Sequence, residues 1–154
     1  MKRWFVIPSL LVVAALTLGT AALAQDAAKA VKERQALMKS NGKNAKALAA
    51  AVKKGKVGAK EAAEAAQIVA NAKKIPTLFP AGSGSDKFKK SRAKPEIWAS
   101  MSKFEGDAAA LGKAAGTFES AAKAGDAAAA GKALKMVSAA CGACHKAFRG
   151  PKPK

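Results

Sequence analysis

The chain has 154 residues and is strongly basic, with 28 Lys and Arg residues against 10 Asp and Glu residues and a formal net charge of +18. Half of the residues are hydrophobic, but most of these are alanine; aromatic residues make up only 5% and tyrosine is absent. Such a composition favours helices and argues against a β-rich fold, because no segment alternates β-branched with polar residues. The length fits one domain.

The first 24 residues are expected to be a cleaved secretory signal peptide. Lys2 and Arg3 give a positive start, an apolar run covers residues 5–18, and Ala22-Leu23-Ala24 is an A-x-A cleavage sequence. The apolar run is short for a transmembrane helix, so a retained membrane anchor is the weaker alternative. We therefore predict an exported, periplasmic domain spanning residues 25–154, with a net charge of about +16.

Two amphipathic helices are predicted before residue 76. The first covers about 26–54, with Asp26 as its N-cap and with Asn41 and Gly42 allowing a bend. Its inward stripe follows steps of about three and four residues: Ala27, Val31, Gln35, Met38, Ala45, Leu48 and Val52. The second helix covers about 59–74, presents small residues inward, and ends before Pro76, because the residue preceding a proline disfavours helix.

Residues 76–94 form one long predicted loop. A loop of this length in a compact domain needs a structural reason, and we expect it to cross over one end of a helix bundle, with Leu78, Phe79 and Phe88 as anchors. The loop ends in a basic run made of Lys87, Lys89, Lys90, Arg92 and Lys94. A solvated surface is the simpler interpretation of this run, and a docking role is the alternative.

Two further helices, at about 95–124 and 126–149, complete the prediction. Pro95 and Glu96 suit a first turn, and Asp126 suits an N-cap. The 95–124 helix carries the clearest core stripe, with Ile97, Met101, Phe104, Ala108, Leu111, Ala115, Phe118 and Ala122 in steps of four and three. Four helices joined by two short turns and one long loop predict an all-α, antiparallel four-helix bundle.

The sequence Cys141-Gly142-Ala143-Cys144-His145, near the end of the last helix, is the attachment signature of a c-type haem. Cysteines at i and i+3 lie on one helix face, so both sulfurs can form thioethers with one ring edge. The histidine then offers an imidazole nitrogen to the iron as proximal ligand. The chain contains no other cysteine or histidine. We therefore predict one covalently bound haem c.

Other uses of these residues fit less well. A dithiol redox motif usually follows a strand in a βαβ pattern, which is not found here. A structural zinc ion needs four ligands, more than this cluster supplies. A plain disulfide stays open as the alternative in an oxidising compartment. We expect no enzyme, because the one histidine is used by iron, and no nucleic-acid binding, because the lysines are scattered and no such motif occurs.

The C-terminal position of the C-x-x-C-H motif, followed by Lys146-Ala147-Phe148-Arg149, resembles the class II c-type cytochromes, the cytochrome c′ superfamily. Two further stretches are similar to that family: the VKERQ sequence at 31–35 and the KPEIW sequence at 94–98. The resemblance covers the whole mature chain. It implies a four-helix bundle with one covalent haem near the C-terminal end of its last helix.

The resemblance also implies roles for residues around the haem. Cys141 and Cys144 correspond to the thioether sites, His145 to the proximal ligand, and Arg149 to a basic residue beside its imidazole. Arg34 and Gln35 correspond to residues that contact the haem propionates. An arginine offers a carboxylate a bidentate fork, although a solvated arginine on a charged helix is the plainer alternative.

Function depends on the sixth coordination position of the iron. The resemblance implies one of two arrangements. In a gas-binding branch of the family this position is empty and is blocked by an apolar residue, and in a low-spin branch a methionine takes the place of that residue. In this sequence the same place is occupied by Met38. A thioether is a soft ligand that raises the haem potential, although methionine is also a common core filler. We expect a periplasmic electron carrier of the low-spin, Met/His-ligated branch, with a five-coordinate NO or CO binder as the alternative.

The expected partners follow from charge. A strongly positive surface predicts redox partner proteins with acidic docking surfaces. We expect no nucleic acid and no stable membrane insertion after the signal peptide is cleaved, and a homodimer stays open.

Overall fold

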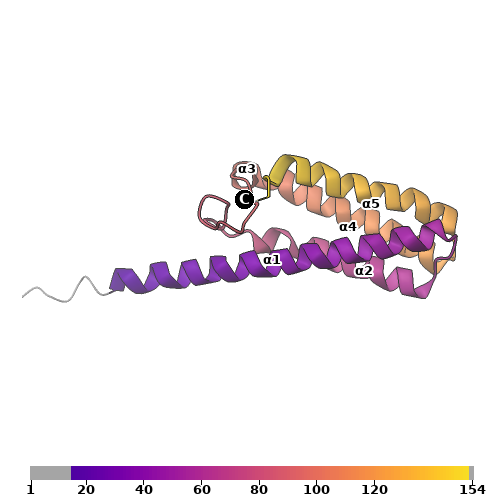
Figure 1. Cartoon of the computed structure of the whole chain (residues 1–154), viewed down its shortest axis with the longest axis horizontal. Coiled ribbons are helices and arrows are strands. Elements are labelled where there is room, and N and C mark those ends of the chain that lie inside the picture. Colours follow the sequence, from indigo (N-terminus) through magenta and orange to yellow (C-terminus); the bar gives the residue numbers. More distant parts are fainter. Residues whose placement is uncertain (1–14, 153–154) are drawn as a thin grey trace, which may run out of the picture.

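Four long helices form an antiparallel bundle in the computed structural model, which describes the backbone of residues 15–152 and the side chains of residues 26–152 (Figure 1). The long helices are α1 (Ala15–Lys53), α2 (Ala59–Lys74), α4 (Met101–Lys123) and α5 (Ala127–Phe148). The connection between α2 and α4 contains a 3₁₀ turn, η1 (Pro76–Leu78), and a one-turn helix, α3 (Glu96–Ala99). The predicted all-α four-helix bundle is confirmed.

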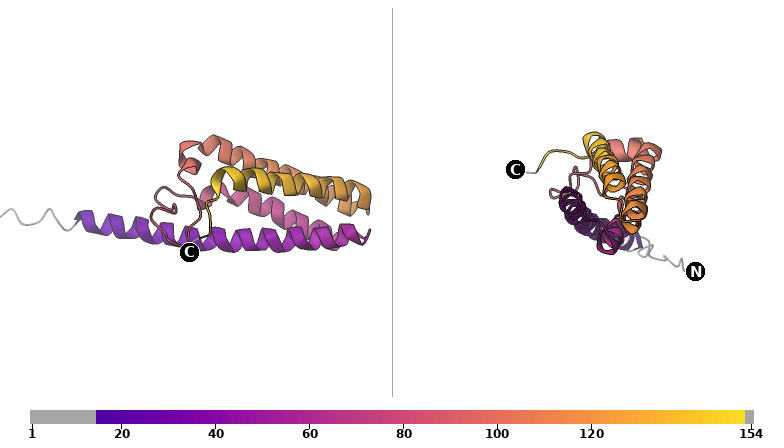
Figure 2. Two further views of the ribbon diagram at one scale, coloured as in Figure 1. Left: turned by 45° about the horizontal axis from the view of Figure 1, so that its top comes forward. Right: turned by 90° about the vertical axis from the view of Figure 1, so that its right-hand side faces the viewer.

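The beginning of α1 differs from the prediction. The helix starts at Ala15, so Asp26 lies inside it and is not its N-cap. Alanine and leucine dominate residues 15–24 and are strong helix formers, which explains the upstream continuation. Views along and across the bundle show the first turns of α1 projecting beyond the other helices (Figure 2). The predicted charged start of the signal peptide lies outside the described residues.

The core combines a few large side chains with many alanines. Phe118, Leu48, Ile68, Ile97 and Val137 are almost completely buried. Fully buried alanines on α2, α4 and α5 (Ala65, Ala115, Ala122 and Ala130) allow neighbouring helices to approach closely. No helix in the described range 15–152 is long and apolar enough to cross a membrane.

The buried face of α1 follows the predicted stripe at Ala27, Val31 and Leu48 and departs from it at Gln35. Gln35 is exposed, whereas its neighbour Arg34 is only 5% exposed. Asn41 is also buried, and its side-chain oxygen accepts a 2.7 Å hydrogen bond from the Asn71 amide of α2. The helix α1 runs through Asn41 and Gly42 without interruption.

The predicted 95–124 helix is broken at Ser100, where φ −137° and ψ 50° leave the helical region. The short α3 before the break is held to the preceding loop, since the Trp98 indole donates a 3.0 Å hydrogen bond to the Phe79 carbonyl. This bond joins residues that are 19 positions apart in the sequence. A helical periodicity reports only on near neighbours and could not predict it. In contrast, α5 begins as predicted, with the Asp126 carboxylate accepting from the Ala129 amide at 2.9 Å.

Residues 76–94 cross one end of the bundle, as the sequence predicts. Phe79 is buried, and Leu78 and Phe88 are half-buried. The loop lies at the same end of the bundle as the last turn of α5 and the C-terminus (Figure 1). This end holds the residues for which the sequence predicts a haem.

Candidate functional site

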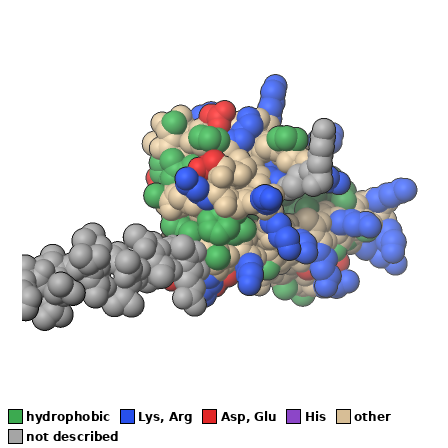
Figure 3. Space-filling model, turned by 60° about the vertical axis from the view of Figure 1, so that its left-hand side comes forward, with side chains coloured by type: hydrophobic (Ala, Val, Ile, Leu, Met, Phe, Trp, Pro, Cys, Tyr) green, Lys and Arg blue, Asp and Glu red, His purple; other side chains and the backbone are tan. Residues whose placement is uncertain are grey.

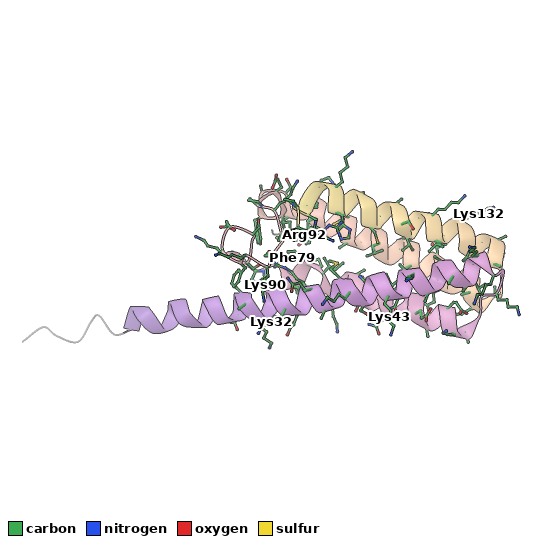
Figure 4. The ribbon with its side chains drawn as sticks, in the orientation of Figure 1. Lys32, Lys43, Phe79, Lys90, Arg92 and Lys132 are labelled. Carbon is green, nitrogen blue, oxygen red and sulfur yellow. The ribbon has the colours of Figure 1, made fainter. Side chains whose placement is uncertain are left out.

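A pocket of about 440 Å³ opens at this end of the bundle, between α1, the loop and the last turns of α5. Its volume falls in the range of natural cofactor and ligand pockets. Six of the seven predicted site residues line it: Arg34, Gln35, Met38, Cys144, His145 and Arg149. The seventh, Cys141, is half-buried one turn earlier on α5 and does not line this pocket. Figure 4 shows Phe79, Lys90 and Arg92 of the loop between α1 and the end of α5.

The two thiols are free, half-buried and on consecutive turns of α5. The pKa of Cys144 is raised to about 11, chiefly by burial and further by the Asp107 carboxylate and Cys141, while the Lys103 ammonium lowers it. Burial also raises the pKa of Cys141. Both sulfurs are therefore protonated at neutral pH, and both stand on one face of a rigid helix.

The imidazole of His145 is held in its neutral form. Burial lowers its pKa first, and the nearby cations Arg149 and Arg92 lower it further. A neutral imidazole has a free nitrogen lone pair, which is the form that binds a metal ion. His145 therefore has the protonation state that an iron ligand requires before any metal is bound.

Met38 faces the same space from α1. It is half-buried and lines the pocket together with His145, although the two residues stand on different helices. The other described methionines do not line it: Met101 is half-buried on α4, and Met136 is 48% exposed on α5. The pocket thus contains one thioether and one imidazole, the pair that the sequence singles out.

Three phenylalanine rings form an apolar wall. The Phe79 and Phe104 ring centroids are 4.7 Å apart at an interplanar angle of 68°, and those of Phe104 and Phe148 are 5.3 Å apart at 88°. Both pairs have the edge-to-face arrangement that aromatic quadrupoles prefer. All three rings are buried and line the pocket, so its wall is both apolar and stiff.

Arg34 is buried among acceptors of the loop. Its Nη1 donates to the Leu78 carbonyl at 3.2 Å and to the Ser83 hydroxyl at 2.7 Å. Its Nη2 donates to the Ser83 carbonyl and, at 2.7 Å, to the Ser91 hydroxyl. The guanidinium also lies over the Phe79 ring, 4.5 Å from its centroid. Four of its five N–H donors therefore fix the loop, and the Nε–H is the fifth.

Gln35 acts on the same loop, because its side-chain amide donates to the Lys90 carbonyl at 2.8 Å. The structure thus gives Arg34 and Gln35 a role that the sequence did not predict, as ties between α1 and the loop. Their contact with haem propionates stays a prediction.

A short clip joins the loop to the C-terminal segment beyond α5. Ala93 and Arg149 form an isolated antiparallel bridge, and the Gly150 amide donates to the Arg92 carbonyl at 2.7 Å. The Arg92 Nε donates to the carbonyls of Gly150 at 2.8 Å and Pro151 at 3.1 Å. These bonds hold the backbones of Arg92 and Arg149 side by side at the pocket.

The donor set and the lining fit haem c. The last turns of α5 supply two thiols and a neutral imidazole, and the adjoining pocket has an aromatic wall. A haem also has two carboxylates, and the lining contains five cationic side chains and no acidic one: Arg34, Lys39, Lys90, Arg92 and Arg149. Sequence reasoning missed the three rings and Lys39 as site residues. The basic run at 87–94 contains Lys90 and Arg92 and could have drawn attention to them. Its spacing in the sequence, however, does not show that it lies near the C-x-x-C-H motif.

Comparison with known proteins agrees with this geometry. The profile of the family described as cytochrome c′ matches residues 29–149. The chain belongs to the cytochrome c′ family. A protein of this family binds one covalent haem c, and here the Cys141 and Cys144 spacing supplies its attachment motif.

Relatives and solved structures cover most of the domain. Cytochrome c′ of Rhodospirillum rubrum is 32% identical over 150 residues, 97% of this chain and 99% of that protein. Cytochrome c-556 of Agrobacterium tumefaciens (strain II Chrys) is 38% identical over 121 residues, 77% of this chain and 95% of that protein. The crystal structure of cytochrome c′ from Thermochromatium tepidum superposes with a TM-score of 0.70 at 30% identity, covering 80% of this chain and 95% of that one.

Two further solved structures concern ligands and assembly. One is a nitric oxide complex of a mutant cytochrome c′ from Alcaligenes xylosoxidans, with 30% identity and a TM-score of 0.58, covering 82% of this chain and 97% of that one. The other is a cytochrome c′ with ligand-controlled dimer dissociation, with 28% identity and a TM-score of 0.70, covering 80% of this chain and 95% of that one. These comparisons support the cytochrome c′ superfamily, but they do not support the low-spin branch that the sequence led us to expect. They fit the gas-binding alternative better than the electron carrier.

Proposed function

We propose that this protein is a periplasmic electron carrier whose haem c would be attached through Cys141 and Cys144 and whose iron would be bound by His145 and Met38. The observation that supports this proposal is that the Met38 thioether and the His145 imidazole line one pocket from different helices. Cys141 and Cys144 hold the haem covalently, and burial keeps His145 neutral for the metal. The bound haem supplies a one-electron couple, and a thioether ligand favours its reduced form.

The surrounding residues keep the site dry and fixed. Phe79, Phe104 and Phe148 exclude water from one wall, which limits the rearrangement of solvent when the charge of the site changes. Arg34 holds the loop that carries Phe79, so the wall keeps its shape. We assign no catalytic residue, since this arrangement holds a redox group and offers no free general base.

The export of the protein is part of the proposal. The A-x-A sequence at residues 22–24 predicts cleavage before Gln25. The match to the family profile begins at residue 29, after this cleavage site, so cleavage there would leave the matched domain whole.

Binding of NO or CO at an open sixth position is the second candidate. It is favoured by the comparisons, since the matching family is cytochrome c′ and one structural neighbour is a nitric oxide complex. The two candidates differ in one property of this chain. In the first candidate the Met38 sulfur occupies the sixth position, and in the second Met38 only fills space.

The absorption spectrum of the holoprotein in both oxidation states, with and without CO, separates the two candidates. The proposal predicts a low-spin haem that takes up little CO, and a Met38→Ala variant that becomes high-spin and takes up CO readily. Met101→Ala is the matched control, because Met101 is also half-buried but does not line the pocket. Rapid CO uptake by the unmodified protein would establish the gas-binding candidate instead.

A further inference from the structure

The charges of this protein are distributed unevenly over the bundle. The α4 helix balances three lysines with three acids, and α2 carries three lysines and two acids. By contrast, α5 carries three lysines and no acid, and the loop before α3 carries five cations against the single acid Asp86. On the face seen in Figure 3, Lys and Arg side chains are widespread and Asp and Glu side chains are few. The positive field is therefore strongest on the α1, α5 and loop side.

Four cations stand at the mouth of the haem pocket. These cations, which we call the rim, are Lys39 of α1, Lys90 and Arg92 of the loop, and Arg149 after α5. Lys39, Lys90 and Arg149 are exposed, and Arg92 is half-buried. Asp86, the only acid of the loop, does not line the pocket.

The rim is held in place by its backbone. Gln35 fixes the Lys90 carbonyl, and the bridge between Ala93 and Arg149 fixes the segments that carry Arg92 and Arg149. The Arg92 side chain is itself held by its bonds to the carbonyls of Gly150 and Pro151. A charge that is held in place loses less conformational freedom when it binds an oppositely charged surface.

From these observations we propose that the rim is the docking surface for an acidic one-electron redox protein, which meets this protein at the mouth of its haem pocket. This inference rests on the proposed electron-carrier function and gives it a location. One electron passes between the partner's redox centre and the haem iron, so that one is oxidised as the other is reduced. Carboxylates on the partner pair with Lys39, Lys90, Arg92 and Arg149, and they bring its redox centre near the pocket.

Two other anionic surfaces fit the rim less well. A membrane-binding face usually inserts apolar side chains, and the one large exposed hydrophobic residue in the described part of the chain is Met136. Single-stranded nucleic acid usually stacks on aromatic rings, and Phe79, Phe104 and Phe148 are buried at 9%, 2% and 4% exposure. A folded protein with a carboxylate patch requires neither feature.

The test compares two double variants of the holoprotein that change the net charge equally. Lys39→Glu with Lys90→Glu reverses two charges of the rim, and Lys60→Glu with Lys113→Glu reverses two exposed charges on α2 and α4. The probe is a plant-type [2Fe–2S] ferredoxin, used as a small acidic one-electron protein. Binding is measured by calorimetry, and electron transfer by stopped flow, at low and physiological salt.

We expect the rim variant to weaken ferredoxin binding and slow electron transfer by about tenfold or more at low salt, and the control variant to change either by less than about twofold. Equal losses in both variants would overturn the proposal, because net charge alone would then explain them. A rim variant that loses binding to phosphatidylserine vesicles but keeps its ferredoxin affinity would also overturn it. The visible spectra of both variants, recorded without a partner, show separately whether the haem still cycles between its oxidation states.

Discussion

Replacing Arg34 tests whether the loop owes its position to one buried guanidinium. Four N–H groups of Arg34 bind acceptors on residues 78–91, and hydrogen bonds from a charged group contribute about 1.5–3 kcal/mol each. Burying a cation costs several kcal/mol, and this burial lowers the Arg34 pKa to about 10. The Ser83 carbonyl also keeps a second donor, the Ser91 hydroxyl. We therefore expect Arg34→Ala to lower the free energy of unfolding by about 3 kcal/mol net.

The assay is guanidinium unfolding of the holoprotein, together with hydrogen exchange of the loop amides. A loss of about 3 kcal/mol lowers the melting temperature of a domain of this size by about 10 °C. Exchange should accelerate over residues 79–93 and not in the middle of α4. Arg34→Lys should recover part of the loss, because one ammonium cannot reproduce the fork. Lys32→Ala, an exposed change on the same helix, is the control, and an Arg34→Ala result indistinguishable from it would refute the reasoning.

Two further predictions concern the chain and its cysteines. Intact mass of the secreted protein should correspond to residues 25–154 plus one haem, and a mass that retains residues 1–24 would contradict the processing. Replacing Cys141 and Cys144 with serine should leave a helical but loosely packed chain, because the core is rich in alanine; a sharp, native-like thermal transition of that variant without haem would show a self-sufficient bundle.

The bundle could be predicted because its information is local. The steps of three and four in α4 and the C-x-x-C-H spacing in α5 depend only on neighbouring residues. The phase of α1 was wrong by one residue at Arg34 and Gln35. A charged residue is normally assigned to the solvent face, and the acceptors that satisfy Arg34 belong to residues 44–57 positions away.

The same limit applies to the break at Ser100 and to the rim. The segment before the break is bonded to the loop through Trp98 and Phe79, and the rim is held by the bridge between Ala93 and Arg149. Both contacts join segments that the sequence leaves apart. The sequence identified the residues that attach a haem, whereas the tertiary contacts identified what surrounds it.

Whether Met38 binds the haem iron is tested most directly by the proton NMR spectrum of the reduced holoprotein. The ring current of a haem shifts the resonance of a methionine methyl group that lies over its face far upfield. Reduced iron with Met and His ligands is low-spin and diamagnetic, so this resonance is sharp. We expect one such three-proton resonance, which is present in Met101→Leu and missing in Met38→Leu. A reduced protein with a paramagnetic, high-spin spectrum and no upfield methyl resonance would show that Met38 does not bind the iron.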